Sequence, residues 1–258
     1  MNNELQTMLN FARQAAREGG LSTLGHFRRN VEIIDKEDGT PVTIADRNAE
    51  VIIRKMIESK YPDHGIHGEE FGIKEPAAGC SYQWFIDPID GTKSFIHGVP
   101  FYTTLLGLLR NGECVVGVIE CTPLEEQVSA AQGLGAWLNG RPTRVSETKD
   151  LSKAVVLTTD PRRLYNQSPR TGWQEIWEGC AYPRCWGDAY GHLMVATGRA
   201  DLMLDPISAP YDVSPMPIIM KEAGGAFFNW KGSESIFEGS GNSMNKHMEP
   251  IVRKALGL

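Results

Sequence analysis

The chain of 258 residues contains no long apolar run. No stretch reaches the ~18 consecutive apolar residues that are typical of a membrane-spanning helix. The first residues, with Glu4 among polar neighbours, lack the apolar core of a secretory signal peptide. We therefore expect a cytoplasmic protein that does not associate with a membrane.

Cysteine is scarce and unsuitably spaced for a structural role. The five cysteines are Cys80, Cys114, Cys121, Cys180 and Cys185. Their number is odd and no two form a C-x-x-C pair, which argues against a zinc site or a disulfide framework. Reduced thiols are the default for such a chain, in agreement with a cytoplasmic location.

Positive charge is also in deficit. The chain has 26 Lys and Arg against 32 Asp and Glu, which gives a formal net charge of −6 at pH 7. An acidic chain has no general attraction for nucleic acid. If such a protein binds a phosphate group, metal cations are the simplest source of the positive charge that binding requires.

The most informative segment is W-F-I-D-P-I-D-G-T at residues 84–92. It places Asp87 and Asp90 three residues apart, and carboxylates are hard oxygen ligands that suit Mg²⁺ or Mn²⁺. Pro88 restricts the backbone between them. If a helix begins after Gly91, its first amides can bind a phosphate. The segment favours metal-assisted chemistry at a phosphate, although an Asp-rich turn is commonly only a capped turn.

Further acidic residues occur in three other segments. They are Asp46, the pair Glu69-Glu70 after Gly68, and Asp212, which precedes E-A-G-G at residues 222–225. Each alone has an ordinary explanation, because paired Glu commonly forms a solvated face and Asp commonly caps a helix. Taken together with residues 84–92, and in this order, they form a strong signal for chemistry rather than for ordinary capped turns.

The ordered set G-E-E, W-x-x-D-P-I-D-G-T and Y-D followed by E-A-G-G resembles the inositol monophosphatase family of Mg²⁺-dependent phosphatases. The resemblance extends from Leu5 to Val252. It implies a layered α/β sandwich, a homodimer, a small phosphorylated metabolite as substrate, and two or three Mg²⁺ ions per active site, with Mn²⁺ as an alternative. It also implies that residues 36–40 belong to a segment that closes over the metals.

The resemblance also implies a role for individual residues. Thr92 and Asp46 would form the hydrogen-bonded catalytic pair that positions the attacking water, with Glu70 as an outer ligand or a support of the ligands. The amides of Gly91 and Thr92 would hold the phosphate. The implied metal ligands are Glu69, Asp87, the backbone carbonyl of Ile89, Asp90 and Asp212.

Physical chemistry supports a cation at such a cluster. Four or five neighbouring carboxylates repel one another when ionised, so that without cations their joint ionisation is disfavoured. Divalent ions remove this repulsion and attract a phosphate monoester dianion. They can also lower the pKa of a bound water and neutralise the leaving oxygen.

The choice of substrate depends on other segments. The run W-G-D-x-Y-G-H at residues 186–192, the sequence D-G-T-K-S-F and the segment A-T-G-R-A-D-x-M-x-D-P resemble the histidinol-phosphatase branch of the family. This implies L-histidinol phosphate, whose ammonium and imidazole could bind Asp188 and Asp205. Arg184 is a further candidate substrate-binding residue, which could pair with Asp188, contact phosphate or reach a neighbouring subunit.

Other interpretations remain open. The same chemistry could act on inositol 1-phosphate or on another small sugar or nucleotide phosphate. Alternatively, the chain could be a metal-binding relative without turnover, although the retained pair of Thr92 and Asp46 argues against this. Asp188 could be only a helix cap, and Asp205 could cap the turn at Pro206.

Hydrophobic periodicity predicts mixed α/β structure in both halves. In the first half we expect a mostly antiparallel sheet flanked by two helices, the first of which Gly19-Gly20 would stop. The first-half elements are helices over 5–16 and from Asp46 to before Pro62, a hairpin of strands 102–109 and 113–120 around Asn111-Gly112, and one or two strands around 133–140.

In the second half the pattern restarts after residue 150, with little periodicity over 161–179. The expected elements are a strand at 154–158, a helical turn at 173–177, a helix from 187 to 197, a strand at 200–204, a helix from Asp212 to Glu222, a strand at 226–229 and a last helix after 245. We expect one compact domain over residues 1–258. A soft boundary near 150 would separate a metal-site half, 1–150, from a substrate-pocket half, 151–258.

Overall fold

The computed structural model describes residues 2–29, 33–35, 41–167 and 172–258, and the expected closing segment 36–40 lies outside them. The helices are α1 (Asn2–Leu24), α2 (Ile44–Lys60), α3 (Thr92–Ile96), α4 (Pro161–Gln167), α5 (Gly172–Gly179), α6 (Asp188–Ala196), α7 (Pro210–Val213), α8 (Met216–Glu222) and α9 (Glu249–Leu256), with 3-10 turns η1 (Thr122–Leu124) and η2 (Leu151–Lys153).

The strands of the described residues form two large sheets and a short pair, β1 with β2. The strands are β1 (Ile33–Asp35), β2 (Pro41–Thr43), β3 (Gly65–Gly68), β4 (Gly72–Lys74), β5 (Tyr82–Asp90), β6 (Thr103–Arg110), β7 (Glu113–Cys121), β8 (Glu126–Ala131), β9 (Ala136–Leu138), β10 (Arg141–Pro142), β11 (Val155–Thr158), β12 (Tyr182–Arg184), β13 (Leu202–Asp205), β14 (Ala226–Phe228) and β15 (Gly241–Met244).

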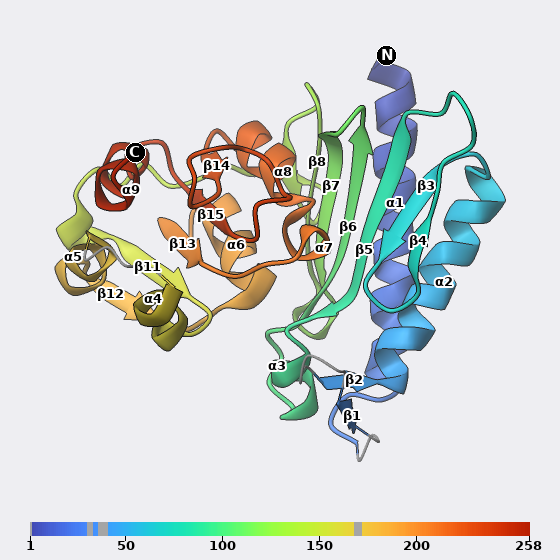
Figure 1. Cartoon of the computed structure of the whole chain (residues 1–258), viewed down its shortest axis with the longest axis horizontal. Helices are drawn as coiled ribbons and strands as arrows, with labels where there is room; N and C mark the ends of the chain where they lie inside the picture. Colours follow the sequence, from blue (N-terminus) through green and yellow to red (C-terminus); the bar gives the residue numbers. More distant parts are fainter. Residues whose placement is uncertain (1, 30–32, 36–40, 168–171) are drawn as a thin grey trace.

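The elements are stacked in alternating layers (Figure 1). Within the described residues, the larger sheet has eight strands in the order β10-β9-β8-β7-β6-β5-β3-β4, and the smaller has five in the order β12-β11-β13-β15-β14. Helices α1 and α2 cover one face of the larger sheet, α6 and α8 lie between the sheets, and α5 packs beside α9 beyond the smaller sheet. The fold is therefore the layered α/β sandwich that the resemblance implied.

The larger sheet confirms the prediction of a mostly antiparallel sheet. Of the pairings described, only that between β3 and β5 is parallel. The predicted hairpin joins β6 to β7, and its turn residues Asn111 and Gly112 have φ angles of 53° and 83°. Two consecutive residues with positive φ match the tight turns that join twisted antiparallel strands.

The prediction that Gly19-Gly20 ends the first helix is wrong, since α1 continues to Leu24. A Cβ atom on Gly19 would lie 2.6 Å from a side-chain carbon of Ile53, and one on Gly20 would lie 2.1 Å from the hydroxyl of Thr122. The two glycines therefore serve close packing of α1 against α2 and η1 rather than chain termination. Residue spacing cannot distinguish these two uses of glycine.

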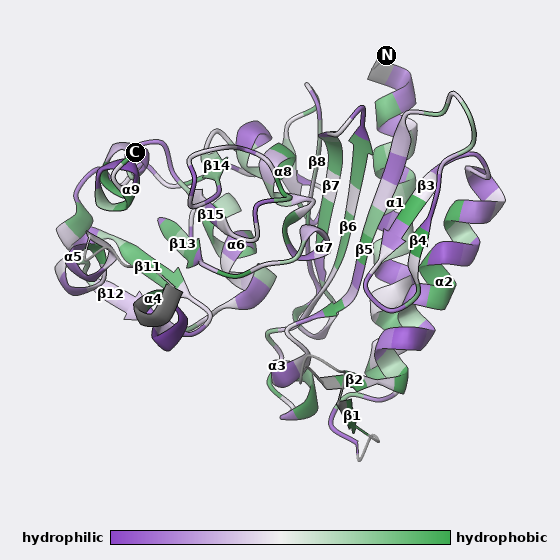
Figure 2. Cartoon of the chain, in the orientation of Figure 1, coloured by the Kyte–Doolittle hydropathy of each residue, from purple (hydrophilic) through white to green (hydrophobic). Residues whose placement is uncertain are grey.

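The interior of the sandwich is apolar on both sides of the larger sheet. Figure 2 shows hydrophobic residues concentrated along the strands of this sheet and on the helix faces that cover it. Helix α6 is buried from Ala189 to Ala196, because it lies between two sheets and needs no polar face. This burial fixes α6, and with it the position of Asp188 at its start. No described helix combines the length and apolarity that crossing a membrane demands.

Two helices occupy the stretch where the sequence predicted only one helical turn. Helices α4 and α5 both fall within residues 161–179, and Trp173 and Ile176 of α5 are buried. Helix α5 packs against α9, about 80 residues further along the chain. Its stability therefore comes from a tertiary contact rather than from local periodicity. The organisation as a single domain stays a prediction.

Candidate active site

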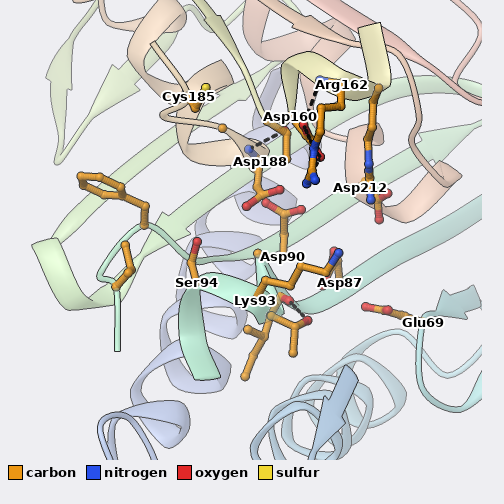
Figure 3. A pocket seen from close by; sticks show the side chains of 18 residues that line it. Glu69, Asp87, Asp90, Lys93, Ser94, Asp160, Arg162, Cys185, Asp188 and Asp212 are labelled. Carbon is orange, nitrogen blue, oxygen red and sulfur yellow. Dashed lines mark hydrogen bonds and ion pairs between the residues drawn. The ribbon is translucent and has the colours of Figure 1, made fainter. Parts of the chain in front are cut away.

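A pocket of about 530 Å³ lies between the end of β5 and the segments around α4, α6 and α7 (Figure 3). Most of the predicted site residues line it, and both halves of the chain contribute. The predicted residues in its lining are Glu69, Asp87, Ile89, Asp90, Gly91, Thr92, Asp188 and Asp212. Four predicted residues are outside the lining, namely Asp46, Glu70, Arg184 and Asp205.

An irregularity at the end of β5 presents the two carboxylates of the D-P-I-D segment. The register with β6 shifts between Asp87 and Asp90, as expected when a proline interrupts a strand. Gly91 then adopts a φ of 84°, and α3 begins at Thr92. A Cβ atom on Gly91 would lie 3.0 Å from a carboxylate oxygen of Asp188, so both backbone angle and space favour glycine here.

Asp87 is a deeply buried carboxylate among the predicted metal ligands. Its side chain is 2% exposed, and its Oδ1 atom has no hydrogen-bond partner. Burial, followed by the charges of Glu69, Asp90 and Asp212, raises the pKa of Asp87 well above its ordinary value. A buried, unpaired carboxylate oxygen is costly, and a cation is the group that would offset this cost.

Asp90 links the two halves of the chain. Its Oδ2 atom accepts hydrogen bonds from the amide of Ala189 at 2.5 Å and from the hydroxyl of Thr103 at 3.3 Å. Its carboxylate also lies near that of Asp188, and Figure 3 shows both projecting into the pocket. Burial, then the charges of Asp188 and Asp212, raises the pKa of Asp90 well above its ordinary value.

Asp212 belongs to a short helix rather than opening a long one. The predicted helix from Asp212 to Glu222 is divided into α7 and α8, with the break at Ser214-Pro215. Pro215 and Pro217 lack the amide donors that a continuous helix would need. The Oδ2 atom of Asp212 accepts a hydrogen bond from the amide of Ala209 at 2.7 Å. Burial is the main cause that raises the pKa of Asp212 to about 7.

Glu50, which was not among the predicted site residues, supports the turn that carries Glu69. This buried side chain accepts hydrogen bonds from the amides of Glu70 at 2.7 Å and Phe71 at 3.2 Å. It also pairs with Arg54 at 2.6 Å. The signal was present, because Glu50 is a charged residue on the inward face of an amphipathic helix. Glu70 contributes its backbone here, while its side chain is outside the pocket lining.

The expected hydrogen bond between Thr92 and Asp46 is replaced by other contacts in the described structure. The Thr92 hydroxyl donates to the carbonyl of Ile89 at 3.1 Å. Asp46 instead accepts from the amide and the hydroxyl of Thr43, at 2.8 and 2.7 Å. Thr43 is the cap of α2, and Asp46 completes the capping box from the third helical position. Burial raises the pKa of Asp46 to about 6.

Asp188 faces the pocket from the start of α6. Gly187 occupies the cap position of that helix, so the alternative in which Asp188 is only a cap is not supported. Asp188 has a φ of 50°, and its amide donates to the hydroxyl of Thr159 at 2.9 Å. Burial raises the pKa of Asp188, whereas the positive charges of Arg163 and Lys93 lower it.

Two predicted substrate contacts are placed elsewhere. Asp205 is 8% exposed at the end of β13, and burial followed by the charge of Asp188 raises its pKa well above the ordinary value. Arg184 is exposed on β12, where it donates to the carbonyl of Pro183 and lies 5.9 Å from the ring of Trp186. Neither Asp205 nor Arg184 lines the pocket, so the structure gives no support for direct contact with a substrate. Such contact stays a prediction.

The segment around the start of α4 was overlooked as part of the site. Thr159, Asp160, Arg162 and Arg163 all line the pocket. The available signal was the cluster of charged residues directly after the predicted strand 154–158. The residues that follow have weak periodicity and give no further signal.

The carboxylates suit a divalent cation by their chemistry, but they are not arranged around one point. Among the residues that the structure describes, no three His, Cys, Asp or Glu side chains are placed so that they could hold a metal ion. The unpartnered oxygen of Asp87 and the raised pKa values of Asp90 and Asp212 nevertheless fit a cation. Binding by this set would require the carboxylates to rotate.

Comparison with known proteins agrees with this geometry. The model of the inositol monophosphatase family matches residues 4–254. The chain belongs to the inositol monophosphatase family. Members of this family are phosphatases and are generally Mg²⁺-dependent, which makes the chain a phosphoric monoester hydrolase by family.

Individual relatives carry different names. The histidinol-phosphatase of Chlorobaculum parvum is 40% identical over 246 residues, which cover 93% of this chain and 94% of that protein. The fructose-1,6-bisphosphatase/inositol-1-monophosphatase of Aquifex aeolicus is 32% identical over 232 residues, 86% of each protein. The solved structure of an IMPase from Thermotoga maritima matches with a TM-score of 0.86 at 29% identity and 97% coverage of both chains.

Proposed function

We propose that this family member is a Mg²⁺-dependent phosphomonoesterase that hydrolyses L-histidinol phosphate to L-histidinol and phosphate. The observation that carries the proposal is the meeting of two acidic groups in one pocket. Asp87 and Asp90 lie beside the predicted phosphate cradle at Gly91, and Asp188 faces the same space from α6. Asp87 and Asp90 suit metal ions that bind a phosphate, and Asp188 suits the cationic alcohol portion of the substrate.

The metal-binding residues are the predicted set. Glu69, Asp87, Asp90, Asp212 and the carbonyl of Ile89 would hold Mg²⁺, which when bound would activate water and neutralise the leaving oxygen. Ile89 can keep its hydrogen bond from Thr92 in that state, because a carbonyl oxygen has two lone pairs. The Thr92 hydroxyl is thereby held beside the predicted ligands, where it would orient the attacking water.

The substrate assignment is supported by charge and by similarity. L-histidinol phosphate carries an ammonium group and an imidazole, and an inositol ring has neither. Asp188 would offer either group a charge-assisted hydrogen bond. The relative that is 40% identical over nearly the whole chain is named a histidinol-phosphatase. A pocket of about 530 Å³ also suits a small metabolite.

The second candidate substrate is a sugar or inositol phosphate. The observation in its favour is that Arg162 and Arg163 line the pocket, since arginine binds phosphate well. The Aquifex aeolicus relative is named for fructose-1,6-bisphosphate and inositol 1-phosphate. These arginines could hold a second phosphate or the hydroxyl groups of a sugar.

The test is a comparison of kcat/KM for phosphate release from L-histidinol phosphate, inositol 1-phosphate and fructose 1,6-bisphosphate with Mg²⁺. We expect a preference for L-histidinol phosphate of about a hundredfold or more, roughly 2.7 kcal/mol of differential transition-state binding. In D188A the KM should rise more for L-histidinol phosphate than for inositol 1-phosphate, whose alcohol portion is neutral. Equal rates on all three substrates would refute the assignment.

The remaining expectations concern the state of the protein. We infer a cytoplasmic homodimer that acts on a small phosphorylated metabolite, with no nucleic acid or membrane partner. The mass of the purified protein in solution, measured by light scattering after gel filtration, tests the dimer. A mass near that of one 28.5 kDa chain would contradict it.

A further inference from the structure

Asp160 lies on the pocket wall at the junction between β11 and α4. Its carboxylate is fixed locally, because Oδ1 accepts a hydrogen bond from the amide of Arg162 at 2.9 Å, as in a helix cap. Its side chain is 26% exposed, so one side of the carboxylate meets solvent. Among the charged residues that line the pocket, Asp160 is one to which the sequence analysis assigned no role.

Asp160 belongs to the same wall as Asp188. The preceding residue, Thr159, accepts a hydrogen bond from the amide of Asp188 at 2.9 Å. A Cβ atom on Gly187 would lie 2.3 Å from the Cα of Thr159, so the two segments are in tight contact. Burial, followed by the negative charge of the nearby Asp160, raises the pKa of the Cys185 thiol. Asp160 and Asp188 therefore face one space from adjoining segments.

Arg162 forms an ion pair with the carboxylate of Asp160. The guanidinium of Arg162 donates from Nε at 3.1 Å to Oδ1 and from its terminal nitrogen at 3.0 Å to Oδ2. The Arg162 side chain is 86% exposed, and Figure 3 shows it beside Asp160 at the pocket. An ion pair this exposed contributes little to stability, so exchanging Arg162 for another cation costs little.

We propose that Asp160 is a specificity-determining residue that accepts the cationic group of the substrate's alcohol portion in place of Arg162. This deepens the proposed function and rests on it. Arg162 balances the charge of the carboxylate before the substrate arrives and competes with the substrate for it afterwards. The cap from the Arg162 amide keeps the carboxylate oriented during the exchange.

Lone-pair counting permits this exchange. A carboxylate offers about four acceptor positions. The amide of Arg162 uses one position on Oδ1, and its guanidinium makes one hydrogen bond to Oδ1 and two to Oδ2. Release of the guanidinium frees positions on both oxygens for an ammonium or an imidazolium. An uncharged alcohol cannot replace the guanidinium in this way, so Arg162 would remain paired with Asp160. Asp160 would then give no advantage to a substrate with a neutral alcohol portion.

The chain offers a matched control for a purely structural role. Asp150 caps η2 in the same manner, with its Oδ1 atom accepting from the amide of Ser152 at 2.9 Å. Asp150 is outside the pocket lining. Asn caps helices as well as Asp does, so Asp160→Asn and Asp150→Asn both keep the cap and remove one negative charge.

The experiment compares kcat/KM for L-histidinol phosphate with that for glycerol 2-phosphate, whose alcohol portion is neutral. We expect the ratio of the two values to fall at least tenfold in D160N, mainly through KM for the cationic ester, and to stay unchanged in D150N. In R162M the ratio should rise severalfold, because the competing cation is gone. Inhibition by L-histidinol, which has no phosphate, should weaken in D160N by a similar factor.

The outcomes separate the two levels of the proposal. If the wild-type enzyme prefers L-histidinol phosphate and D160N keeps the full preference, the role of Asp160 is refuted while the proposed function stands. If R162M lowers both values equally, Arg162 acts on the phosphate and the exchange is refuted. If the wild-type enzyme hydrolyses both esters without preference, the substrate assignment fails and the role of Asp160 fails with it.

Discussion

Replacing Asp212 with Asn should make the metal-free protein more stable, although it should remove activity. Asp212 lies among the charges of Glu69 and Asp188, and burial raises its pKa to about 7. A carboxyl whose pKa is higher in the folded than in the unfolded state destabilises the fold at high pH. This destabilisation begins to decrease as the pH falls through the folded pKa, and it is gone only below the unfolded pKa. Asn retains the oxygen that accepts the amide of Ala209.

The size of the effect follows from the pKa. Between pH 8 and pH 5, the folded protein takes up a proton on Asp212 near pH 7, whereas the unfolded chain does so only near the ordinary value of 3.8. The two units between pH 7 and pH 5, at about 1.36 kcal/mol each, give about 3 kcal/mol. For a chain of 258 residues this corresponds to roughly 5–10 °C in the unfolding midpoint.

The assay is thermal unfolding of both proteins in a chelator at pH 8 and pH 5. Comparing each wild-type midpoint with that of D212N at the same pH cancels the titrating groups that do not interact with Asp212. Among these is His192, whose pKa burial lowers to about 3. The stability advantage of D212N should be large at pH 8 and should shrink by about 3 kcal/mol at pH 5. An advantage that stays constant, or grows toward pH 5, would refute the reasoning.

Three further predictions concern single positions. T92A should lower kcat by about 10²–10⁴ because the attacking water loses its orienting hydroxyl, with an unchanged unfolding midpoint; near-normal kcat would contradict this role. E50Q should raise the Mg²⁺ concentration needed for half-maximal activity, because the turn that carries Glu69 loses the charged side chain that supports it. E58Q, on the exposed side of α2, should leave this concentration unchanged. G20A should destabilise the protein by about 1–3 kcal/mol in chemical denaturation, because its Cβ would meet a hydroxyl oxygen at 2.1 Å; a gain in stability would show that helix propensity dominates.

The predicted metal ligands illustrate what a sequence can provide. Asp87 and Asp90 are close in sequence, and the turn between them is determined locally by Pro88 and Gly91. Their convergence with Glu69 and Asp212 was predicted from the resemblance, and the structure places all four around one pocket. Hairpins and amphipathic helices have clear periodic patterns, which predicted mixed α/β structure. The layered sandwich was predicted only from the family resemblance.

The errors have a common physical origin in contacts between distant segments. The close approach of α1 at Gly20 depends on Thr122, which no local pattern connects to it. Asp46 bonds to its own cap residue rather than to Thr92, because a capping box competes for the same carboxylate. The proposed role of Asp160 depends on the packing of β11 beside the start of α6. Such contacts become visible only when the sheet order is known.

The central claim is that the carboxylate cluster binds Mg²⁺ and thereby hydrolyses L-histidinol phosphate. The most direct test is phosphate release from this substrate by wild-type protein and by D87N, first in EDTA and then with Mg²⁺ restored in excess. We predict no release in EDTA, full recovery of the wild type with Mg²⁺, and a rate for D87N that stays lower by orders of magnitude. Undiminished release in EDTA, or normal turnover by D87N, would contradict the account.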